Sequence, residues 1–170
     1  DPAFPPMLPD SGAVLSGDGV LSAVRFADGR VSIHRRYVGT ARHLAEKAAG
    51  KALFGIYRNP FTDAPEVKGV DRTVANTTPV WHAGRLLMCK EDGLPYHVDP
   101  HTLDTIGRYN FGGALKSETM TAHVRVDAET GELFAYGYEA DGLASDTISY
   151  FIVGPDGALK TEHFIKAPYA

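Results

Sequence analysis

The side chain with the clearest chemical potential in this 170-residue chain is the imidazole of His123. It lies in the alternating segment 121–126, just ahead of a turn at 127–131. The alternation predicts a strand with Thr121, His123 and Arg125 on one face. An imidazole on a strand that enters a tight turn can present a ring nitrogen to a metal ion. A lone strand histidine is more often structural than ligating, so the residue type by itself favours a structural role.

Tyr57, Lys90 and Glu91 also have side chains that could do chemistry. Tyr57 opens the run Tyr-Arg-Asn-Pro-Phe-Thr-Asp (57–63), and Lys90 opens Lys-Glu-Asp-Gly (90–93). An ammonium beside a phenol favours the phenolate and lowers the pKa of the phenol. A carboxylate can accept the distal N–H of a ligating imidazole and orient its ring. The structural alternatives are a core tyrosine, a solvated lysine and a glutamate in an ordinary turn.

Other conspicuous residues favour structural roles. His82 lies in the turn sequence Trp-His-Ala-Gly (81–84) and is predicted to be structurally fixed. Asp18, in Gly-Asp-Gly (17–19), marks a turn, because the stretch lacks both the phosphate-loop lysine and the dinucleotide-binding spacing. Cys89 is the single cysteine, so the chain can form neither an internal disulfide nor a Cys-x-x-Cys zinc site. This cysteine usage fits a reducing compartment.

Composition excludes some classes of partner. Hydrophobic residues make up 44% of the chain and charged residues 22%, which is ordinary for a globular protein. The net charge of −4 argues against a nucleic-acid partner, since such proteins usually carry clustered positive charge. There is no run of about 18 apolar residues and no signal-peptide pattern. We therefore expect no integral membrane segment and a cytoplasmic location.

The elements that must position these residues are mostly strands. Two apolar runs, 20–26 and 31–37, flank an Asp-Gly turn, which is a strong hairpin signal. Thr40 can cap a short helix over 40–49, and Gly50 can end it. The proline-rich residues 1–15 predict an extended arm.

The rest of the chain again alternates strands with turns. Predicted strand pairs are 79–83 with 86–89, 121–126 with 133–138, and 148–153 with 159–165. Short strands at regular intervals indicate an all-β sandwich or propeller built from antiparallel hairpins. Residues 1–170 are therefore predicted to form one all-β domain with one short helix.

Four segments together carry a family resemblance: 57–63, Val-Trp-His-Ala-Gly-Arg (80–85), Thr-Ala-His followed by Asp-x-Glu-Thr-Gly-Glu-Leu (121–133), and Gly-Tyr-Glu-Ala-Asp-Gly (137–142). They resemble the carotenoid cleavage oxygenases, non-haem iron enzymes that split carbon–carbon double bonds with O₂, and are most similar to the lignostilbene dioxygenase branch. The resemblance runs roughly over residues 17–170. It implies that the chain is an N-terminal third of a larger catalytic domain, forming part of a seven-bladed β-propeller.

The resemblance also implies roles for the four candidate residues. His123 would be one of four histidine ligands of Fe²⁺, and Glu91 would orient a ligating histidine that lies outside this chain. Tyr57 and Lys90 would contact the phenolic hydroxyl of a hydroxystilbene. A phenolate para to the alkene pushes electron density onto the double bond. A carotenoid offers no phenol, and a buried lysine would then lack a partner.

The expected function is an iron(II) dioxygenase that cleaves a hydroxystilbene to two aldehydes, with a small aromatic alkene and O₂ as substrates and no organic cofactor. An alternative is an apocarotenoid-cleaving or carotenoid-cleaving member of the family, which the Tyr57–Lys90 pair disfavours. A third reading is that the 170 residues are inactive by themselves and form a propeller fragment that acts as a binding module. Such an open sector would expose strand edges and apolar surface.

Overall fold

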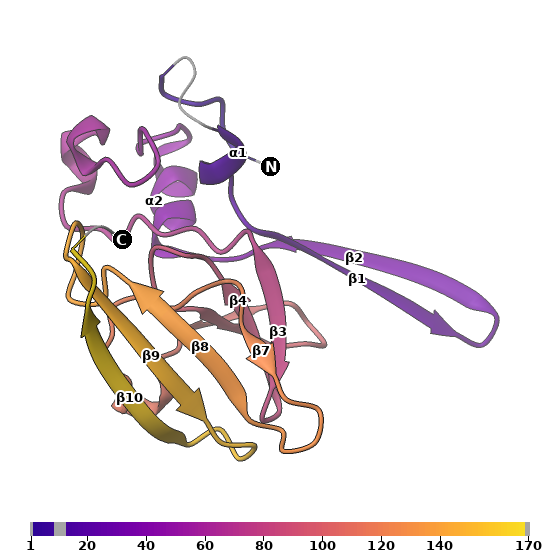
Figure 1. The fold of residues 1–170 in the computed structure, drawn as a ribbon. Coiled ribbons are helices and arrows are strands. Elements are labelled where there is room, and N and C mark those ends of the chain that lie inside the picture. Colours follow the sequence, from indigo (N-terminus) through magenta and orange to yellow (C-terminus); the bar gives the residue numbers. More distant parts are fainter. Residues whose placement is uncertain (1, 9–12, 169–170) are drawn as a thin grey trace.

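The computed structural model describes residues 2–8 and 13–168, which form two four-stranded antiparallel sheets, a separate β-hairpin and a helical region (Figure 1). Within those ranges, no helix has the length and apolar character needed to cross a membrane. The predicted arm over 1–15 is described only in part. Residues 2–8 hold no helix or strand, and the short helix α1 (Ala13–Ser16) begins within the range of the arm.

The first hairpin matches its prediction. Strands β1 (Val20–Ala27) and β2 (Arg30–Tyr37) pair in antiparallel register around the turn residues Asp28 and Gly29. Both turn residues have positive φ, 50° and 69°, as a two-residue hairpin turn requires. The hairpin extends well away from the rest of the molecule (Figure 1).

The predicted helix is also confirmed. Helix α2 (Ala41–Ala49) begins where Thr40 Oγ1 accepts a hydrogen bond from the His43 N–H at 3.0 Å. It ends at Gly50, whose φ of 68° is the left-handed conformation that glycine adopts without strain. Two short 3₁₀ helices follow, η1 (Pro60–Thr62) and η2 (Pro65–Val67).

Each sheet is built from strands adjacent in sequence. The order is β3-β4-β5-β6 in one sheet and β10-β9-β8-β7 in the other. Two short strands, β5 and β6, were not predicted. The strands of the first sheet are β3 (Thr78–His82), β4 (Arg85–Cys89), β5 (Tyr96–Val98) and β6 (Thr105–Arg108), followed by a 3₁₀ turn, η3 (Phe111–Gly113). Those of the second are β7 (Arg125–Val126), β8 (Leu133–Tyr138), β9 (Thr147–Val153) and β10 (Leu159–Lys166).

Strand β4 contributes to two hydrophobic cores because its side chains alternate. Leu87 and Cys89 face the core shared by the two sheets, which includes Leu133 and Phe151. Met88 faces the opposite side, where a second core also holds Val38, Val98 and, at its margin, Leu21 and Ala23 of β1. The base of the hairpin therefore packs on the outer face of the first sheet. Stacked antiparallel sheets of this kind fit a portion of a β-propeller.

The prediction of a strand over 121–126 is wrong for its first four residues. Only Arg125–Val126 forms a strand, so His123 precedes β7 and is not on it. Thr121 explains the difference. Its Oγ1 accepts a hydrogen bond from the His123 N–H at 2.9 Å, which occupies a donor that a β-ladder would use. Thr121 and Ala122 are both buried, so the expected alternation of faces is also lost.

Candidate active site

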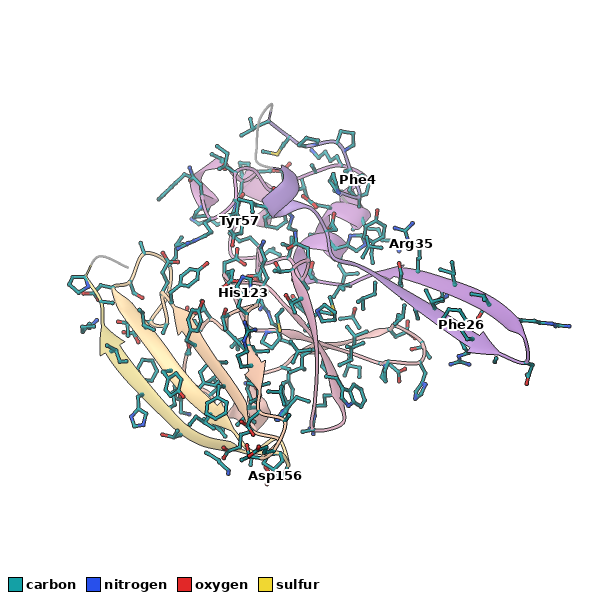
Figure 2. All side chains as sticks on the ribbon, turned by 45° about the vertical axis from the view of Figure 1, so that its right-hand side comes forward. Phe4, Phe26, Arg35, Tyr57, His123 and Asp156 are labelled. Carbon is teal, nitrogen blue, oxygen red and sulfur yellow. The ribbon has the colours of Figure 1, made fainter. Side chains whose placement is uncertain are left out.

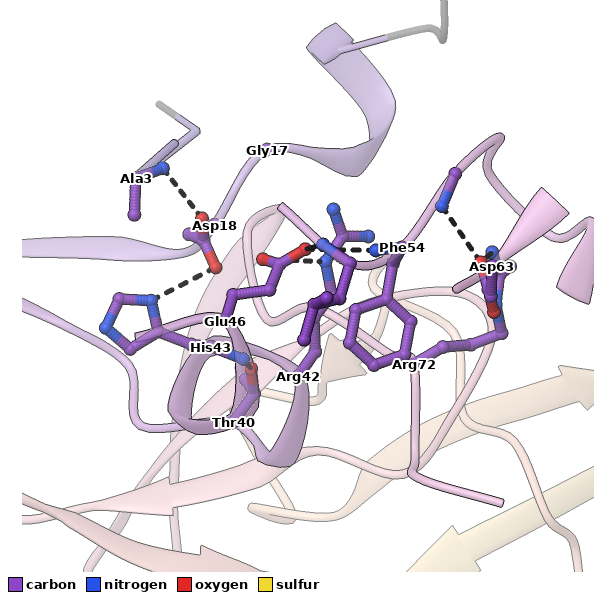
Figure 3. Close-up of polar contacts among 12 residues, drawn as sticks. Ala3, Gly17, Asp18, Thr40, Arg42, His43, Glu46, Phe54, Asp63 and Arg72 are labelled. Atoms are coloured by element: carbon purple, nitrogen blue, oxygen red, sulfur yellow. Dashed lines mark hydrogen bonds and ion pairs between the residues drawn. The ribbon is translucent and has the colours of Figure 1, made fainter. Parts of the chain in front are cut away.

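The loop that carries Tyr57 is anchored on both sides by carboxylates (Figure 3). Before the loop, Glu46 Oε1 of α2 accepts hydrogen bonds from the N–H groups of Leu53 and Phe54, at 2.9 and 3.2 Å. After it, Asp63 binds Arg72 through two hydrogen bonds of 2.9 Å. These bonds fix the two ends of the loop, and Tyr57 lies between them.

Contacts inside the loop narrow its conformation further. Asp63 Oδ1 accepts a hydrogen bond from the Gly55 N–H at 2.9 Å, and Thr62 Oγ1 accepts one from the Ile56 N–H at 2.8 Å. The Asn59 side chain caps η1 through the Phe61 N–H. The run Tyr-Arg-Asn-Pro-Phe-Thr-Asp thus supplies side chains that form hydrogen bonds within its own loop. Much of the motif therefore stabilises the loop conformation.

Lys90 lies directly after β4 and faces the ring of Tyr57. Its side chain is buried, with 5% of the residue exposed, and its Nζ lies 4.7 Å from the centroid of the Tyr57 ring. Such a distance is a cation–π contact. Within the described part of the chain, Lys90 Nζ makes no hydrogen bond or ion pair. The structure therefore brings Tyr57 and Lys90 together and leaves the ammonium with donors to spare.

Burial weakens the charged form of both groups. It lowers the pKa of Lys90, although the carboxylates of Asp92 and Glu91 act in the opposite direction. It raises the pKa of Tyr57, and so do the Asp92 carboxylate and a hydrogen bond between the hydroxyl groups of Tyr57 and Tyr138. The pKa of Asp92 is itself raised by burial, and its Oδ1 has no hydrogen-bond partner among the described residues. Each of the two side chains therefore holds its neutral form more readily than it would in water.

Glu91 and His123 form the second pair of candidate residues. Glu91 Oε1 lies 3.2 Å from His123 Nε2 and also accepts a hydrogen bond from the Ala122 N–H at 3.3 Å. The His123 side chain is 68% exposed, whereas that of Glu91 is 17% exposed. The family resemblance predicts that Glu91 orients a histidine outside this chain. Within the described residues its imidazole contact is His123 itself.

The two pairs adjoin because Lys90 and Glu91 are consecutive. Figure 2 shows Tyr57 and His123 near the middle of the molecule, where the helical region meets the sheets. A hollow of about 600 Å³ lies elsewhere, along residues 60–72, and none of the four candidate residues lines it. The candidate site is thus a face of the molecule at the end of β4.

An exposed imidazole held by a carboxylate suits one ligand position of a metal centre. Imidazole is a common ligand of non-haem iron, and an orienting carboxylate raises its basicity. The described ranges hold no group of three or more His, Cys, Asp or Glu side chains placed to bind a metal ion. His123 and Glu91 therefore fit part of an iron site, and the described chain does not complete it.

Two other predicted positions have structural contacts. His82 is buried, and its Nε2 donates to the Gly131 carbonyl at 3.0 Å, in line with its predicted structural role. Asp18 is buried as well. It accepts a hydrogen bond from the Ala3 N–H at 2.8 Å and lies 3.2 Å from His43 Nδ1 (Figure 3).

Sequence reasoning assigned no role to four residues near the candidate site: Arg58, Asp92 and Tyr138, which act on the pKa of Tyr57, and Glu139. Arg58 forms an ion pair with Glu139 and stacks over the ring of Tyr138, 5.0 Å from its centroid. The signal that pointed to three of them was their place in the motifs 57–63 and 137–142. Nothing in the sequence showed that the two motifs meet.

Comparisons with known proteins place the chain in a family. The family model described as retinal pigment epithelial membrane protein matches residues 2–170. The chain therefore belongs to this family, the carotenoid oxygenases, as its motifs had indicated.

Two of the curated proteins that the chain resembles are named for isoeugenol and lignostilbene. The chain is 49% identical over 155 residues to an isoeugenol monooxygenase of Pseudomonas nitroreducens, covering 91% of this chain and 32% of that protein. It is 43% identical over 169 residues to a lignostilbene-α,β-dioxygenase isozyme of Sphingomonas paucimobilis, covering 99% and 34%. The chain thus spans about a third of the length of these relatives.

Solved structures agree with this placement. The lignostilbene dioxygenase of Pseudomonas brassicacearum superposes with a TM-score of 0.93 at 45% identity, covering 100% of this chain and 35% of that one. An apocarotenoid oxygenase of Synechocystis gives a TM-score of 0.72 at 26% identity, covering 90% and 34%. The arrangement of sheets described above is therefore that of a part of these larger enzymes.

Proposed function

We propose that the whole protein carrying this chain is an iron(II) dioxygenase that cleaves the central alkene of a hydroxystilbene with O₂ to give two aromatic aldehydes. The observation that carries the proposal is Lys90, a buried residue whose Nζ lies 4.7 Å from the centroid of the Tyr57 ring and has no hydrogen-bond or ion-pair partner among the described residues. A buried charge is costly unless it is paired. A phenolic substrate would provide the missing partner.

The chemistry of the pair fits a phenol better than a hydrocarbon. Burial lowers the pKa of Lys90, so an incoming phenolate would stabilise its charged form. The ammonium in turn favours the phenolate, and a charge-assisted hydrogen bond between them would hold the ring in place. Electron density then moves from the phenolate oxygen through the ring onto the alkene, which becomes more reactive toward O₂.

His123 and Glu91 would serve the metal. His123 would hold Fe²⁺ through its exposed imidazole, and Glu91 would orient a ligating ring by accepting its N–H. Iron(II), when bound, makes O₂ reactive toward the alkene. The other three histidine ligands would come from outside these 170 residues, within a seven-bladed propeller that these two sheets begin.

The names of relatives support a phenolic alkene as the substrate class. Two of the relatives are named for isoeugenol and lignostilbene, which are phenols with an alkene conjugated to the ring. A resveratrol cleavage oxygenase of Chaetomium globosum, 47% identical over 173 residues, adds a third compound of this kind. Cleavage of an apocarotenoid is the second candidate, because the Synechocystis structure shares the fold at lower identity.

Labelled oxygen tests the proposal. The whole protein, loaded with Fe²⁺, is given 4-hydroxystilbene under ¹⁸O₂, and the products are reduced at once to prevent exchange with water. We expect two aromatic products that each carry one labelled oxygen, because the reaction adds one atom of O₂ to each alkene carbon. An apocarotenal is offered in parallel. Cleavage of the apocarotenal with none of the hydroxystilbene would overturn the proposal in favour of the second candidate.

A further inference from the structure

We infer that Arg58 and Glu139 are positioning residues that join the Tyr57 loop to the end of β8 and so fix the Tyr57 hydroxyl for contact with a phenol. The inference rests on the proposed function. Its starting point is the ion pair between the Arg58 guanidinium and the Glu139 carboxylate, whose side chains are 32% and 14% exposed. The two residues belong to different parts of the fold, the loop after α2 and the turn that follows β8.

The contacts reach from Arg58 to the candidate site in two steps. Arg58 stacks over the ring of Tyr138, which is the last residue of β8. The hydroxyl groups of Tyr138 and Tyr57 share a hydrogen bond. The ring of Tyr57 faces Lys90 Nζ at 4.7 Å. A displacement of Arg58 would therefore change the orientation of the Tyr57 hydroxyl relative to the ammonium.

The other anchors of the loop do not act on Tyr57 directly. Arg72 holds Asp63 and donates to the backbone carbonyls of Ile56 and Asn59, at 2.9 and 3.4 Å. These bonds secure the residues on either side of Tyr57 and Arg58. The link from this part of the loop to the second sheet is made by side chains, through the Arg58–Glu139 pair and the Tyr57–Tyr138 bond.

Both members of the ion pair have backbone conformations that L-residues seldom adopt. The φ of Arg58 is 59° and that of Glu139 is 52°. Left-handed residues other than glycine, asparagine and aspartate are uncommon and are kept only where their surroundings hold them. An ion pair between two such residues holds both turns in place.

A double-mutant cycle in the whole protein tests the inference. The variants are Arg58→Gln, Glu139→Gln and the two combined, with Arg58→Lys as the conservative change. Glu132→Gln is the matched control, because Glu132 pairs with Lys160 on the same sheet and away from the site. We expect each single variant to lower kcat/KM for 4-hydroxystilbene by about tenfold to a hundredfold, mainly through KM, as misplacement of a binding group does.

Three results, taken together, would support a positioning role for Arg58 and Glu139. The double variant should lose no more activity than either single variant, because the two residues act as one unit. Arg58→Lys should retain more activity than Arg58→Gln, and the loss should be smaller for the methyl ether of the substrate. Multiplicative losses in the double variant, or equal losses on both substrates, would overturn the inference.

Hydrogen exchange separates failure of this inference from failure of the proposed function. Glu139→Gln should speed amide exchange in residues 56–59, and Glu132→Gln should not. If the unmodified protein cleaves no stilbene, the proposed function fails and exchange alone decides whether the pair fixes the loop. Unchanged exchange in Glu139→Gln would overturn the positioning role, whatever the enzyme cleaves.

Discussion

Lys90 and Asp71 differ in how many hydrogen bonds and ion pairs their charged groups make. Lys90 is buried without a hydrogen bond or ion pair in the described residues, while Asp71 accepts hydrogen bonds from Tyr96 of β5 and Arg108 of β6. Structural carboxylates are usually paired, because an unpaired buried charge is costly. This contrast is why we assign Asp71 to stability and Lys90 to function.

Asp71 gives a prediction about pH. Burial alone would raise its pKa, but the ion pair with Arg108 and bonds from Thr73 hold the pKa of Asp71 below its usual value. In the unfolded chain, the Asp71 carboxylate is protonated near pH 4, as a free aspartate is. A depressed carboxyl pKa stabilises the fold above that pH, and the stabilisation disappears as pH falls through the lower folded value. Asp71→Asn should therefore lower Tm at pH 7, and the difference from the unmodified chain should shrink below about pH 4.

Thermal unfolding across pH measures this effect. Glu129→Gln is the control, because Glu129 is exposed in the turn before β8. It should change Tm little at any pH. A Tm difference for Asp71→Asn that stays constant down to pH 2 would show that the Asp71 charge is not the source of the stabilisation.

At the scale of elements, the sequence predicted the hairpin and the helix whose ends are set by neighbouring residues. The Asp28-Gly29 turn set the first hairpin, and Thr40 with Gly50 set the limits of α2. The short strands β5 and β6 were missed because they have three and four residues and their pairing shifts register. Strand alternation misled at Thr121, whose hydroxyl takes the His123 N–H.

The candidate site shows the same limit. Its residue types came from motifs, but their partners came from contacts between distant segments. The Lys90–Tyr57 contact joins the end of β4 to the loop after α2, and the Arg58–Glu139 pair joins that loop to β8. Such contacts depend on how the two sheets stack, which no single segment encodes.

Thr40 gives a prediction at the element scale. It is buried and caps α2, which supports the loop that carries Tyr57. Thr40→Ala should reduce the free energy of unfolding by about 1 kcal/mol, because the His43 N–H would lose its acceptor. Chemical denaturation followed by circular dichroism measures the change. Thr40→Ser keeps the hydroxyl and should cost less, so equal losses in the two variants would point to packing of the methyl group instead of capping.

At the scale of the whole molecule, two features are incomplete within the described residues: the packing of the first hairpin and the set of ligands for a metal ion. The hairpin β1–β2 carries exposed apolar side chains at Val24, Phe26, Val31 and Ile33. In a propeller, such a surface would pack against further strands. The same reasoning applies to the proposed iron site, in which His123 would be one of four ligands and Glu91 would orient a ligating ring.

We therefore predict that the isolated 170-residue chain does not retain stoichiometric iron. One imidazole with a carboxylate beside it offers too few ligands to offset the hydration of the ion and the ordering of the site. Metal analysis after dialysis against buffer decides the point, with His123→Ala as the control. One tightly bound iron per chain that His123→Ala loses would show that the ligand set is complete.

Lys90 is proposed to ionise a phenolic substrate, and comparing two enzymes on two substrates tests this role most directly. In the whole protein, Lys90→Met removes the charge, and a methyl ether of 4-hydroxystilbene cannot ionise. A charge-assisted hydrogen bond is worth roughly 1.5–3 kcal/mol, which corresponds to a loss in rate of about tenfold to a hundredfold. We expect that loss for the phenol and almost none for the ether, with Lys90→Arg in between on the phenol because it keeps the charge with altered geometry. Equal losses on phenol and ether would contradict the account, and an apocarotenoid substrate would then be the better proposal.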